Sequence, residues 1–221
     1  MEYKIIQSGS KGNAIVYNDD IMVDCGVSFK KLKYYYKDLK LVLLTHIHSD
    51  HFNSTTIQAL ANARPLLKFV CCKWLVTPLI ECGVQKKNII VLDLDKQYDF
   101  GKYLITPFKA EHDVPNCGYK IEIKKTGYKI FHATDINSLQ GIEAKNYDLY
   151  CLEANYEEEE LKTRLKEKEE RGEFAYERRV LSTHLSKQEA DLFLLSQMGD
   201  NSECIYCHQH ITKENKNGDC N

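Results

Sequence analysis

The sequence predicts an α/β fold in which strands form the inner layers and helices cover them from outside. Short β-rich runs closed by turn residues fill the first two thirds of the chain, and helical patterns interleave with them in two halves of similar size. The continuous apolar run LVLLT at 41–45 also has the length and composition of a strand buried on both faces. No repeat or Pro/Gly-rich linker interrupts the 221 residues, so we expect a single domain over 1–221.

Local signals delimit each expected element. A turn at SGSKGN follows the first strand, the residues Asn18, Asp19 and Asp20 close a hairpin, and Gly83 stops a helix. The expected strands cover residues 3–7, 14–17, 21–24, 41–45, 89–92, 103–107, 119–123, 128–132, 149–152, 180–183 and 204–206. The expected helices cover residues 28–36, 55–63, 73–82, 157–171 and 187–198.

Composition excludes several classes of protein. The formal net charge is −2, so the chain carries no strongly basic coat for nucleic acid. No run reaches the roughly 18 apolar residues of a membrane span, and no basic stretch leads into a signal-like apolar segment at the start. Nine cysteines, an odd number, fit reduced thiols better than a disulfide framework. We therefore expect a cytoplasmic protein without membrane association, in the host cytoplasm if the protein is viral.

Charge is unevenly distributed along the chain. Lysines and tyrosines are concentrated in FKKLKYYYKDLK at 29–40, whereas EEEE at 157–160 begins an acidic segment. Each run is expected to be a solvated helix face. The alternative for the first run is a rim that attracts phosphate groups and offers tyrosines for stacking.

The segment LVLLTHIHSDHF carries the clearest chemical signal. An apolar strand is followed at once by His46, His48, Asp50 and His51. Alternate residues of an extended loop point the same way, so His46 and His48 can bind one ion while Asp50 and His51 turn towards a second. Imidazole and carboxylate groups are ligands that suit Zn²⁺ and similar metals. The segment therefore predicts a metal site.

Later residues are needed to complete such a site. Further histidines and one aspartate stand at the ends of strand-like runs, which is where open α/β sheets collect functional residues. The candidates are His112, Asp135, His184, His208 and His210. His132 lies within a strand and is expected to be a core residue or to contact a ligand, and Asp24 is expected to orient a ligand histidine.

In these motifs the chain resembles the metallo-β-lactamase superfamily over nearly its whole length. HIHSDH at 46–51 is similar to the superfamily's HxHxDH signature, His112 matches its next ligand, and Asp135 in HATD matches its bridging aspartate. The openings SGSKGNA and DCGVSFKKL resemble YycJ/WalJ-like proteins, and the C-terminal third also resembles ribonuclease Z. The resemblance implies a four-layer αββα sandwich with the site along one edge.

The resemblance also implies roles for residues of the C-terminal third. Glu153 in LEANY and His184 in THLSKQEA match an acidic residue and its partner histidine, the expected proton donor to the leaving group. His210 in IYCHQHITKEN matches the last metal ligand, and His208 is the second choice. The implied metal ligands are His46, His48, Asp50, His51, His112, Asp135 and His210, and the implied catalytic residues are His184, Glu153 and Asp50.

Two positions depart from the pattern of these families. Ser54 stands where a glycine usually follows HxHxDH, so the turn there is expected to be built differently. Tyr156 stands where YycJ-type proteins have a histidine, which weakens the inference of exonuclease activity more than that of phosphodiesterase chemistry. The SGSKGN turn is expected to be a plain hairpin, with phosphate binding through its backbone as the alternative.

The expected function is that of a hydrolase with two divalent metal ions, Zn²⁺ or alternatively Mn²⁺, that cleaves nucleotide phosphodiesters. The slight net negative charge favours a small cyclic nucleotide as substrate, as in the phage anti-Pycsar proteins, which are homodimers and which the chain resembles at superfamily level. One alternative is a YycJ-like single-strand DNA 5′-exonuclease or another nuclease. The other is a non-catalytic binding protein that metal ions stabilise.

Overall fold

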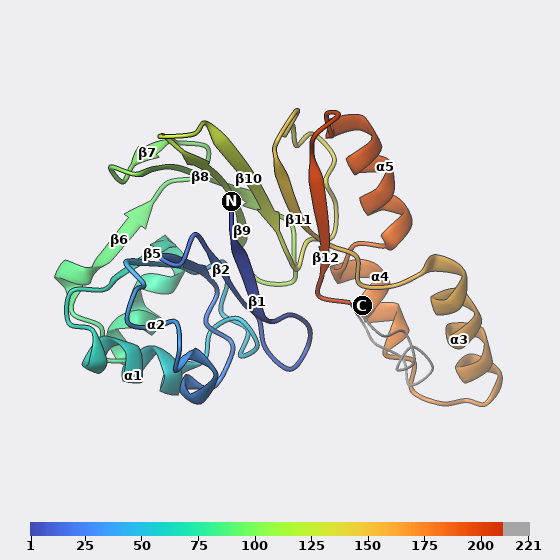
Figure 1. The fold of residues 1–221 in the computed structure, drawn as a ribbon. Helices are drawn as coiled ribbons and strands as arrows, with labels where there is room; N and C mark the ends of the chain where they lie inside the picture. The colour runs from blue at the N-terminus through green and yellow to red at the C-terminus, as the bar shows by residue number, and fades with distance from the viewer. Residues whose placement is uncertain (210–221) are drawn as a thin grey trace.

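Two six-stranded β-sheets form the centre of the protein, and helices cover their outer faces (Figure 1). This computed structural model describes residues 1–209. In spatial order the first sheet consists of β1 (Tyr3–Gln7), β2 (Ala14–Tyr17), β3 (Ile21–Val23), β4 (Leu41–Leu43), β5 (Lys68–Cys72) and β6 (Ile89–Leu92). The second consists of β12 (Glu203–Cys207), β11 (Leu149–Glu153), β10 (Tyr128–Ala133), β9 (Asn116–Ile123), β8 (Tyr103–Ala110) and β7 (Tyr98–Asp99).

The helices fall into two groups. Those of the N-terminal half are η1 (Phe29–Leu32), α1 (Ser54–Ala63), η2 (Lys73–Leu75), α2 (Val76–Glu81) and η3 (Lys86–Asn88), where η denotes a 3-10 helix. Those of the C-terminal half are α3 (Glu158–Glu170), α4 (Glu177–Thr183) and α5 (Lys187–Gln197). Helices α3 and α4 protrude from the body of the molecule as a hairpin, whereas α5 lies against the second sheet (Figure 1).

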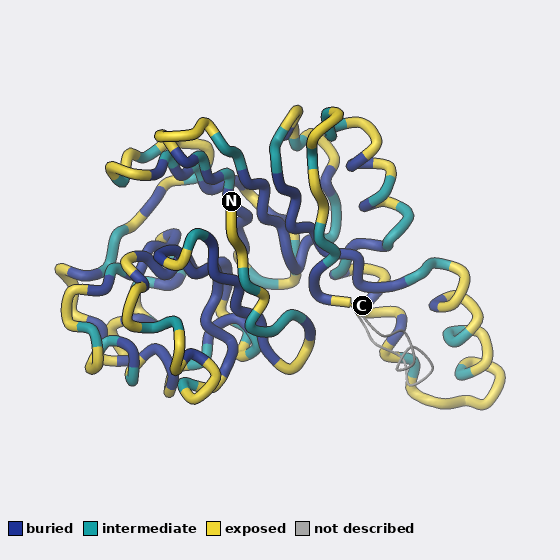
Figure 2. Tube along the Cα trace, viewed as in Figure 1, coloured by how far each residue is buried: buried dark blue, intermediate teal, exposed yellow. Residues whose placement is uncertain are grey.

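Three apolar layers separate these four layers of structure. Along β5, Phe69 and Cys71 pack towards α1 and α2, whereas Val70 and Cys72 pack between the sheets. Along β11, Tyr150 faces α5 and its neighbour Cys151 faces the other sheet. Because alternate side chains of a strand point to opposite faces, both faces of the inner strands must be apolar. The αββα architecture is therefore confirmed, and Figure 2 shows the buried residues running through its centre.

Strand direction brings distant residues to one edge of the molecule. In the first sheet β3, β4, β5 and β6 are parallel. In the second, β10, β11 and β12 are parallel, and β8 shares their direction because both β8 and β10 pair antiparallel with β9. The carboxyl ends of β8, β10, β11 and β12 therefore lie at one edge of that sheet. This edge meets the loop that follows β4.

Most expected elements are present, but β7 was not expected, the helix expected at 73–82 is divided into η2 and α2, and three further differences are larger. The strand expected at 180–183 is wrong: these residues form the last turns of α4, where the His184 amide donates to the Val180 carbonyl (3.0 Å). The helix expected at 28–36 forms only as the 3-10 helix η1, followed by turns. Strand β5 was not expected, because a short apolar run next to a helical pattern does not by itself distinguish strand from helix.

The expectations about membrane spans and cysteines can be compared with the structure only for residues 1–209. Within residues 1–209, no helix combines the length and apolar character needed to cross a membrane. The eight cysteines in the same part of the chain are all free. The assignment of 1–221 to a single domain remains a prediction.

Gly26 allows the loop after β3 to pack against the histidine-rich loop after β4. A Cβ at this position would overlap the backbone carbonyl of Asp50. We expect Gly26→Ala to lower the free energy of unfolding by about 3 kcal/mol, because backbone must shift to relieve the overlap. The matched control is Gly101→Ala, where φ is +75° but space is open, with an expected loss of about 1 kcal/mol. Urea denaturation measures both, and equal losses would contradict the packing role of Gly26.

Candidate active site

Residues from five strand ends and one helix end meet at the edge described above. The loop after β4 contributes four of them, and β8, β10, β11, α4 and β12 contribute one each. They are His46, His48, Asp50, His51, His112, Asp135, Glu153, His184 and His208. The structure thus brings together every site residue expected from the sequence except His210, which lies outside the described residues.

A first set of ligand atoms lies on one side of Asp135. His46, His48, His112 and Asp135 each offer an atom such that all lie within 4.8 Å of one another. His46 Nε2 is 3.5 Å and His112 Nε2 is 3.8 Å from Asp135 Oδ2. Three imidazoles and one carboxylate at this spacing are suited to a single Zn²⁺-like ion.

A second set lies on the other side of Asp135 and consists of Asp50, His51, Asp135 and His208, again with ligand atoms within 4.8 Å of one another. His51 Nε2 is 3.2 Å from Asp135 Oδ2, and His208 Nδ1 is 3.1 Å from Asp135 Oδ1. The carboxylate of Asp135 is therefore common to both sets. It is the expected position for a group that bridges two cations.

His184 and Glu153 form a pair next to the second set. His184 Nδ1 is 2.7 Å from Glu153 Oε1, and the Ile136 amide donates to Glu153 Oε2 (2.8 Å). Glu153 is buried and His184 remains 12% exposed. The same pair, with Asp135 and His208, also forms a third group of ligand atoms within 4.8 Å.

Asp24 holds two parts of the site in place, as expected from the sequence. Its Oδ2 lies 2.6 Å from His51 Nδ1, and its Oδ1 accepts from the Thr45 amide (3.0 Å) and hydroxyl (2.9 Å). Asp24, Asp135 and His208 all have left-handed backbone, with φ of 61°, 52° and 51°. Such backbone strain in non-glycine residues is typical of functional sites.

Side chains of the SGSKGN turn form hydrogen bonds with residues of the site. The Ser8 hydroxyl accepts from the His208 amide (2.7 Å), and Asn13 Nδ2 donates to the Asp50 carbonyl (3.2 Å). Asn13 Nδ2 also lies 2.8 Å from His51 Nε2. The turn is thus a hairpin connection whose side chains contact the site, a role that its glycine-rich sequence did not reveal.

Burial and neighbouring charges perturb several titrating groups in opposite directions. Burial lowers the pKa of His46 to about 4. Burial acts to lower the pKa of His208, but the carboxylates of Asp135, Asp50 and Glu153 outweigh it and raise that pKa to about 10. For Asp135 burial acts to raise the pKa, and the charges of His51 and His208 outweigh it, so its pKa lies well below the usual range. The site holds a carboxylate that stays ionised although it is buried.

Two buried polar atoms of the ligand sets make no hydrogen bond of good geometry within the described part of the chain. Among residues 1–209, His46 Nε2 and Asp135 Oδ1 are buried and have no hydrogen-bond partner. Buried polar atoms without a partner are rare and costly in folded proteins. Both atoms belong to the ligand sets described above, so the residues fit divalent metal ions.

Asp113 is the main site residue that the sequence analysis missed. Its Oδ1 lies 3.3 Å from His48 Nε2 and 3.2 Å from His112 Nε2, and its other oxygen pairs with Arg179 of α4. The Thr183 carbonyl, also in α4, lies 2.9 Å from His112 Nδ1. The position of Asp113 directly after His112 was the only available signal.

Three other residues have clear positions. His132 Nδ1 lies 2.8 Å from the Tyr17 hydroxyl, away from the ligand sets, so His132 is a core residue. Tyr156 packs with Leu161 and Val180 in a small apolar cluster rather than among the ligands. Ser54 begins α1, whose N-terminal amide at Thr56 is capped by the Asn53 side chain, and this is how the turn is built without glycine.

Known proteins match both this fold and this sequence. The family model described as the Beta-lactamase superfamily domain matches residues 20–200. The exodeoxyribonuclease WalJ of Streptococcus pneumoniae is 27% identical, over 97% of this chain and 82% of its own. A ribonuclease Z of Agathobacter rectalis is 25% identical, over 52% of this chain and 43% of its own.

Solved structures extend the agreement to the fold. The metallo-β-lactamase fold protein YhfI of Bacillus subtilis superposes with a TM-score of 0.69 at 19% identity, covering 96% of this chain and 87% of that one. The resemblance noted in the sequence, including its WalJ/YycJ and ribonuclease Z branch, is confirmed. The chain therefore belongs to the β-lactamase superfamily and is a hydrolase with the metallo-β-lactamase fold.

Proposed function

We propose that the chain is a nuclease that uses two divalent metal ions to hydrolyse phosphodiester bonds in nucleic acid. One observation carries the proposal: the carboxylate of Asp135 is shared by two ligand sets, directly beside the His184–Glu153 pair. The named nuclease relatives support nucleic acid as the substrate class. DNA is the substrate that we favour, because a relative that matches over most of both chains is an exodeoxyribonuclease.

Each ion would have its own ligands and share Asp135. His46, His48 and His112 would hold the first ion, and Asp50, His51 and His208 would hold the second. His208 takes the role of last ligand in this proposal, since it lies 3.1 Å from the bridging carboxylate. Zn²⁺ is the ion that we favour for this nitrogen-rich set, and Mn²⁺ is the alternative.

Bound metal ions supply Lewis acidity, which generates a nucleophile from water at neutral pH and offsets charge on the phosphoryl group. Asp50 is the most exposed carboxylate of the two sets, at 21%, and is placed to orient the attacking water. Glu153 holds His184 through Nδ1, which leaves Nε2 free to donate a proton to the leaving oxygen. The His184 ring lies against His112 and His208, at centroid distances of 5.4 and 5.2 Å.

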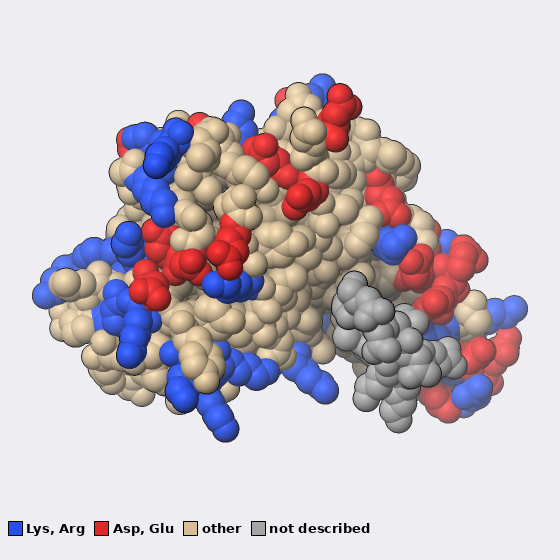
Figure 3. Space-filling model, viewed as in Figure 1, with Lys and Arg blue, Asp and Glu red and all other residues tan. Residues whose placement is uncertain are grey.

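A lysine-rich rim beside the site supports a polymeric substrate. Lys31 donates a hydrogen bond to Gln7, and the next residue, Ser8, contacts His208. Lys30 and Lys31 are exposed, and Lys33 Nζ lies 5.3 Å from the ring centroid of exposed Tyr34. Figure 3 shows basic side chains along the lower edge of the N-terminal half, with an acidic group above them, and mainly acidic side chains mixed with basic ones over α3. A phosphate backbone would be attracted to the first surface and repelled by the second.

Three further expectations from the sequence remain predictions. These are the preference for small cyclic nucleotides, the homodimer and the cytoplasmic location. The non-catalytic alternative has less support, because the described residues contain both ligand sets and the His184–Glu153 pair, and binding alone would not require the pair.

The proposed activity is tested by supplying candidate substrates to the metal-loaded protein. We expect release of nucleotides from single-stranded DNA and hydrolysis of bis(p-nitrophenyl) phosphate, both abolished by EDTA and restored by Zn²⁺ or Mn²⁺. Cyclic AMP, cyclic CMP and cyclic UMP are assayed in parallel. Hydrolysis of cyclic nucleotides without any action on DNA would reverse the order of substrates, and no hydrolysis of any diester would favour the non-catalytic alternative.

Replacement of His184 separates catalysis from metal binding. We expect His184→Ala to keep its metal content, because both ligand sets are intact, and to lose about 10²–10⁴-fold in kcat through loss of the proton donor. Metal analysis and steady-state kinetics give the two quantities. Added imidazole is expected to restore part of the rate. Loss of metal in this variant would instead identify His184 as a ligand.

Metal binding is expected to release protons at pH 8. In the metal-free chain His208, with its pKa raised to about 10, is protonated at this pH, whereas a ligand imidazole must be neutral. Affinity should therefore rise with pH, and proton release should decline as the pH approaches about 10. Calorimetry in buffers of different ionisation enthalpy counts the protons. A binding heat that is independent of the buffer at pH 8 would contradict the protonated state of His208.

A further inference from the structure

A cavity of about 500 Å³ opens beside His112, outside the two ligand sets. Trp74, Leu94, Val114 and Pro115 contribute to its apolar side, and His112 and Asp113 form the side next to the site. This volume lies within the range of small-molecule sites, which are largely apolar with a few polar groups. A group held in the cavity would thus be in contact with a residue of the first ligand set.

Trp74 is the only tryptophan of the chain, and it is fixed in this wall. Its Nε1 donates to the Thr45 carbonyl (3.2 Å), and Thr45 directly precedes His46. The ring is partly buried and packs against apolar clusters on both faces of the first sheet. A rigid aromatic surface is therefore anchored to the same strand end that presents the metal-binding loop.

A second residue that lines the cavity is also hydrogen-bonded to the site. Asn116, which lines it, is buried and donates through Nδ2 to the backbone carbonyl of Asp135 (2.6 Å). Trp74 and Asn116, which both line the cavity, are thus each hydrogen-bonded to backbone that positions ligand residues. The fold therefore fixes the position of this cavity relative to the ligand residues.

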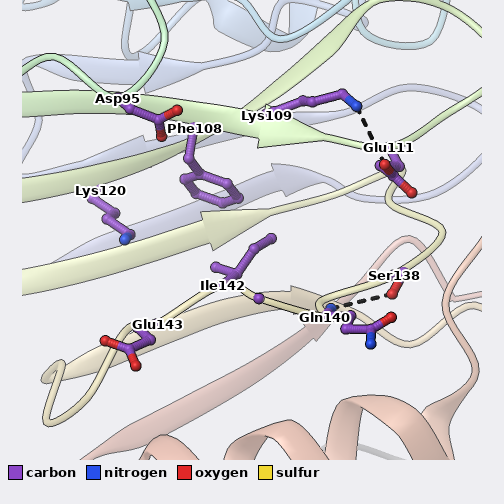
Figure 4. Close-up of a pocket in the computed structure, with 10 residues that line it drawn as sticks. Asp95, Phe108, Lys109, Glu111, Lys120, Ser138, Gln140, Ile142 and Glu143 are labelled. Atoms are coloured by element: carbon purple, nitrogen blue, oxygen red, sulfur yellow. Dashed lines mark hydrogen bonds and ion pairs between the residues drawn. The ribbon is translucent and has the colours of Figure 1, made fainter.

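A neighbouring cavity of about 400 Å³ lacks these properties (Figure 4). It is lined by Lys109 and Glu111, which form an ion pair (3.2 Å) and also line the cavity beside His112. Its half-buried Lys120 lies 5.8 Å from the Phe108 ring centroid, and the acidic side chains of Asp95, Glu111 and Glu143 also line it. No residue of the ligand sets lines it, so the cavity beside His112 is the better substrate pocket.

We propose that this cavity binds the base of the nucleotide next to the phosphodiester that is cleaved, and that Trp74 provides the surface on which the base stacks. This proposal rests on the proposed nuclease function and specifies where the base of the substrate binds. Every base has a flat π face, so stacking on an aromatic ring tolerates any sequence. An exonuclease that removes successive nucleotides needs such sequence-tolerant binding beside its metal ions.

The wild-type protein provides a direct test, because its whole tryptophan fluorescence comes from this wall. We expect deoxyadenosine and thymidine 5′-monophosphates to quench that fluorescence in a saturable way, with inorganic phosphate, which lacks a base, giving no comparable change. The titration is done with the metal-loaded protein and does not require turnover. Absence of quenching by both nucleotides, or equal quenching by phosphate, would overturn the proposal.

Two substrates and three variants extend the test to catalysis. Trp74→Ala is expected to lower kcat/KM for the p-nitrophenyl ester of thymidine 5′-monophosphate at least about fivefold more than kcat/KM for bis(p-nitrophenyl) phosphate, which has no base. Trp74→Phe retains a stacking face and should recover most of this difference. Phe174→Ala, which removes an aromatic side chain 87% exposed on the α3–α4 hairpin, should leave both values unchanged.

The outcomes separate this proposal from the proposed function. Equal losses on both substrates in Trp74→Ala, with no recovery in Trp74→Phe, would mean that Trp74 is only structural, and nuclease activity would stand without the base pocket. Saturable quenching by nucleotides in a protein that hydrolyses no diester would support the pocket while the proposed nuclease function fails.

Discussion

The structure depends on one electrostatic constraint, the buried carboxylate of Asp135. It is 2% exposed and lies within 3.8 Å of ring nitrogens of His46, His51, His112 and His208. A buried charge is tolerated only when opposite charges or metal ions compensate it. In the metal-free chain the pKa values of His51 and His208 are raised, so these two imidazoles compensate Asp135 as cations, whereas bound metal ions would do so without their protons. The same group of atoms can therefore serve either as an ionic cluster or as a bridged metal centre.

The two-sheet architecture makes this arrangement rigid. Residues separated by more than 150 positions, such as His46 and His208, approach each other because both sheets end at the same edge. Asp24 connects the end of β3 to the loop after β4, and the left-handed backbone of Asp24, Asp135 and His208 turns the chain sharply at the strand ends. Backbone strain of this kind persists only where surrounding packing fixes it, and the three apolar layers provide that packing.

Much of this was predictable from the sequence, for identifiable reasons. Apolar runs buried on both faces mark inner strands, and polar residues directly after them, such as HIHSDH and Asp135, mark the functional edge. The strand expected at 180–183 was wrong. Its β-branched and apolar residues favour a strand locally, but they are the last residues of a helix that begins after Tyr176. Asp113 and Asn13 were missed, because their roles arise from contacts across the fold that no local pattern encodes.

The central claim is that Asp135 bridges two cations, and anomalous X-ray diffraction from crystals of the full chain grown with Zn²⁺ tests it most directly. The account predicts two anomalous peaks at the zinc edge, each about 2.0–2.2 Å from an Asp135 oxygen. One peak should be surrounded by the first ligand set and the other by the second. A single peak, or a peak held by His184 and Glu153 with none beside His46, would contradict the account.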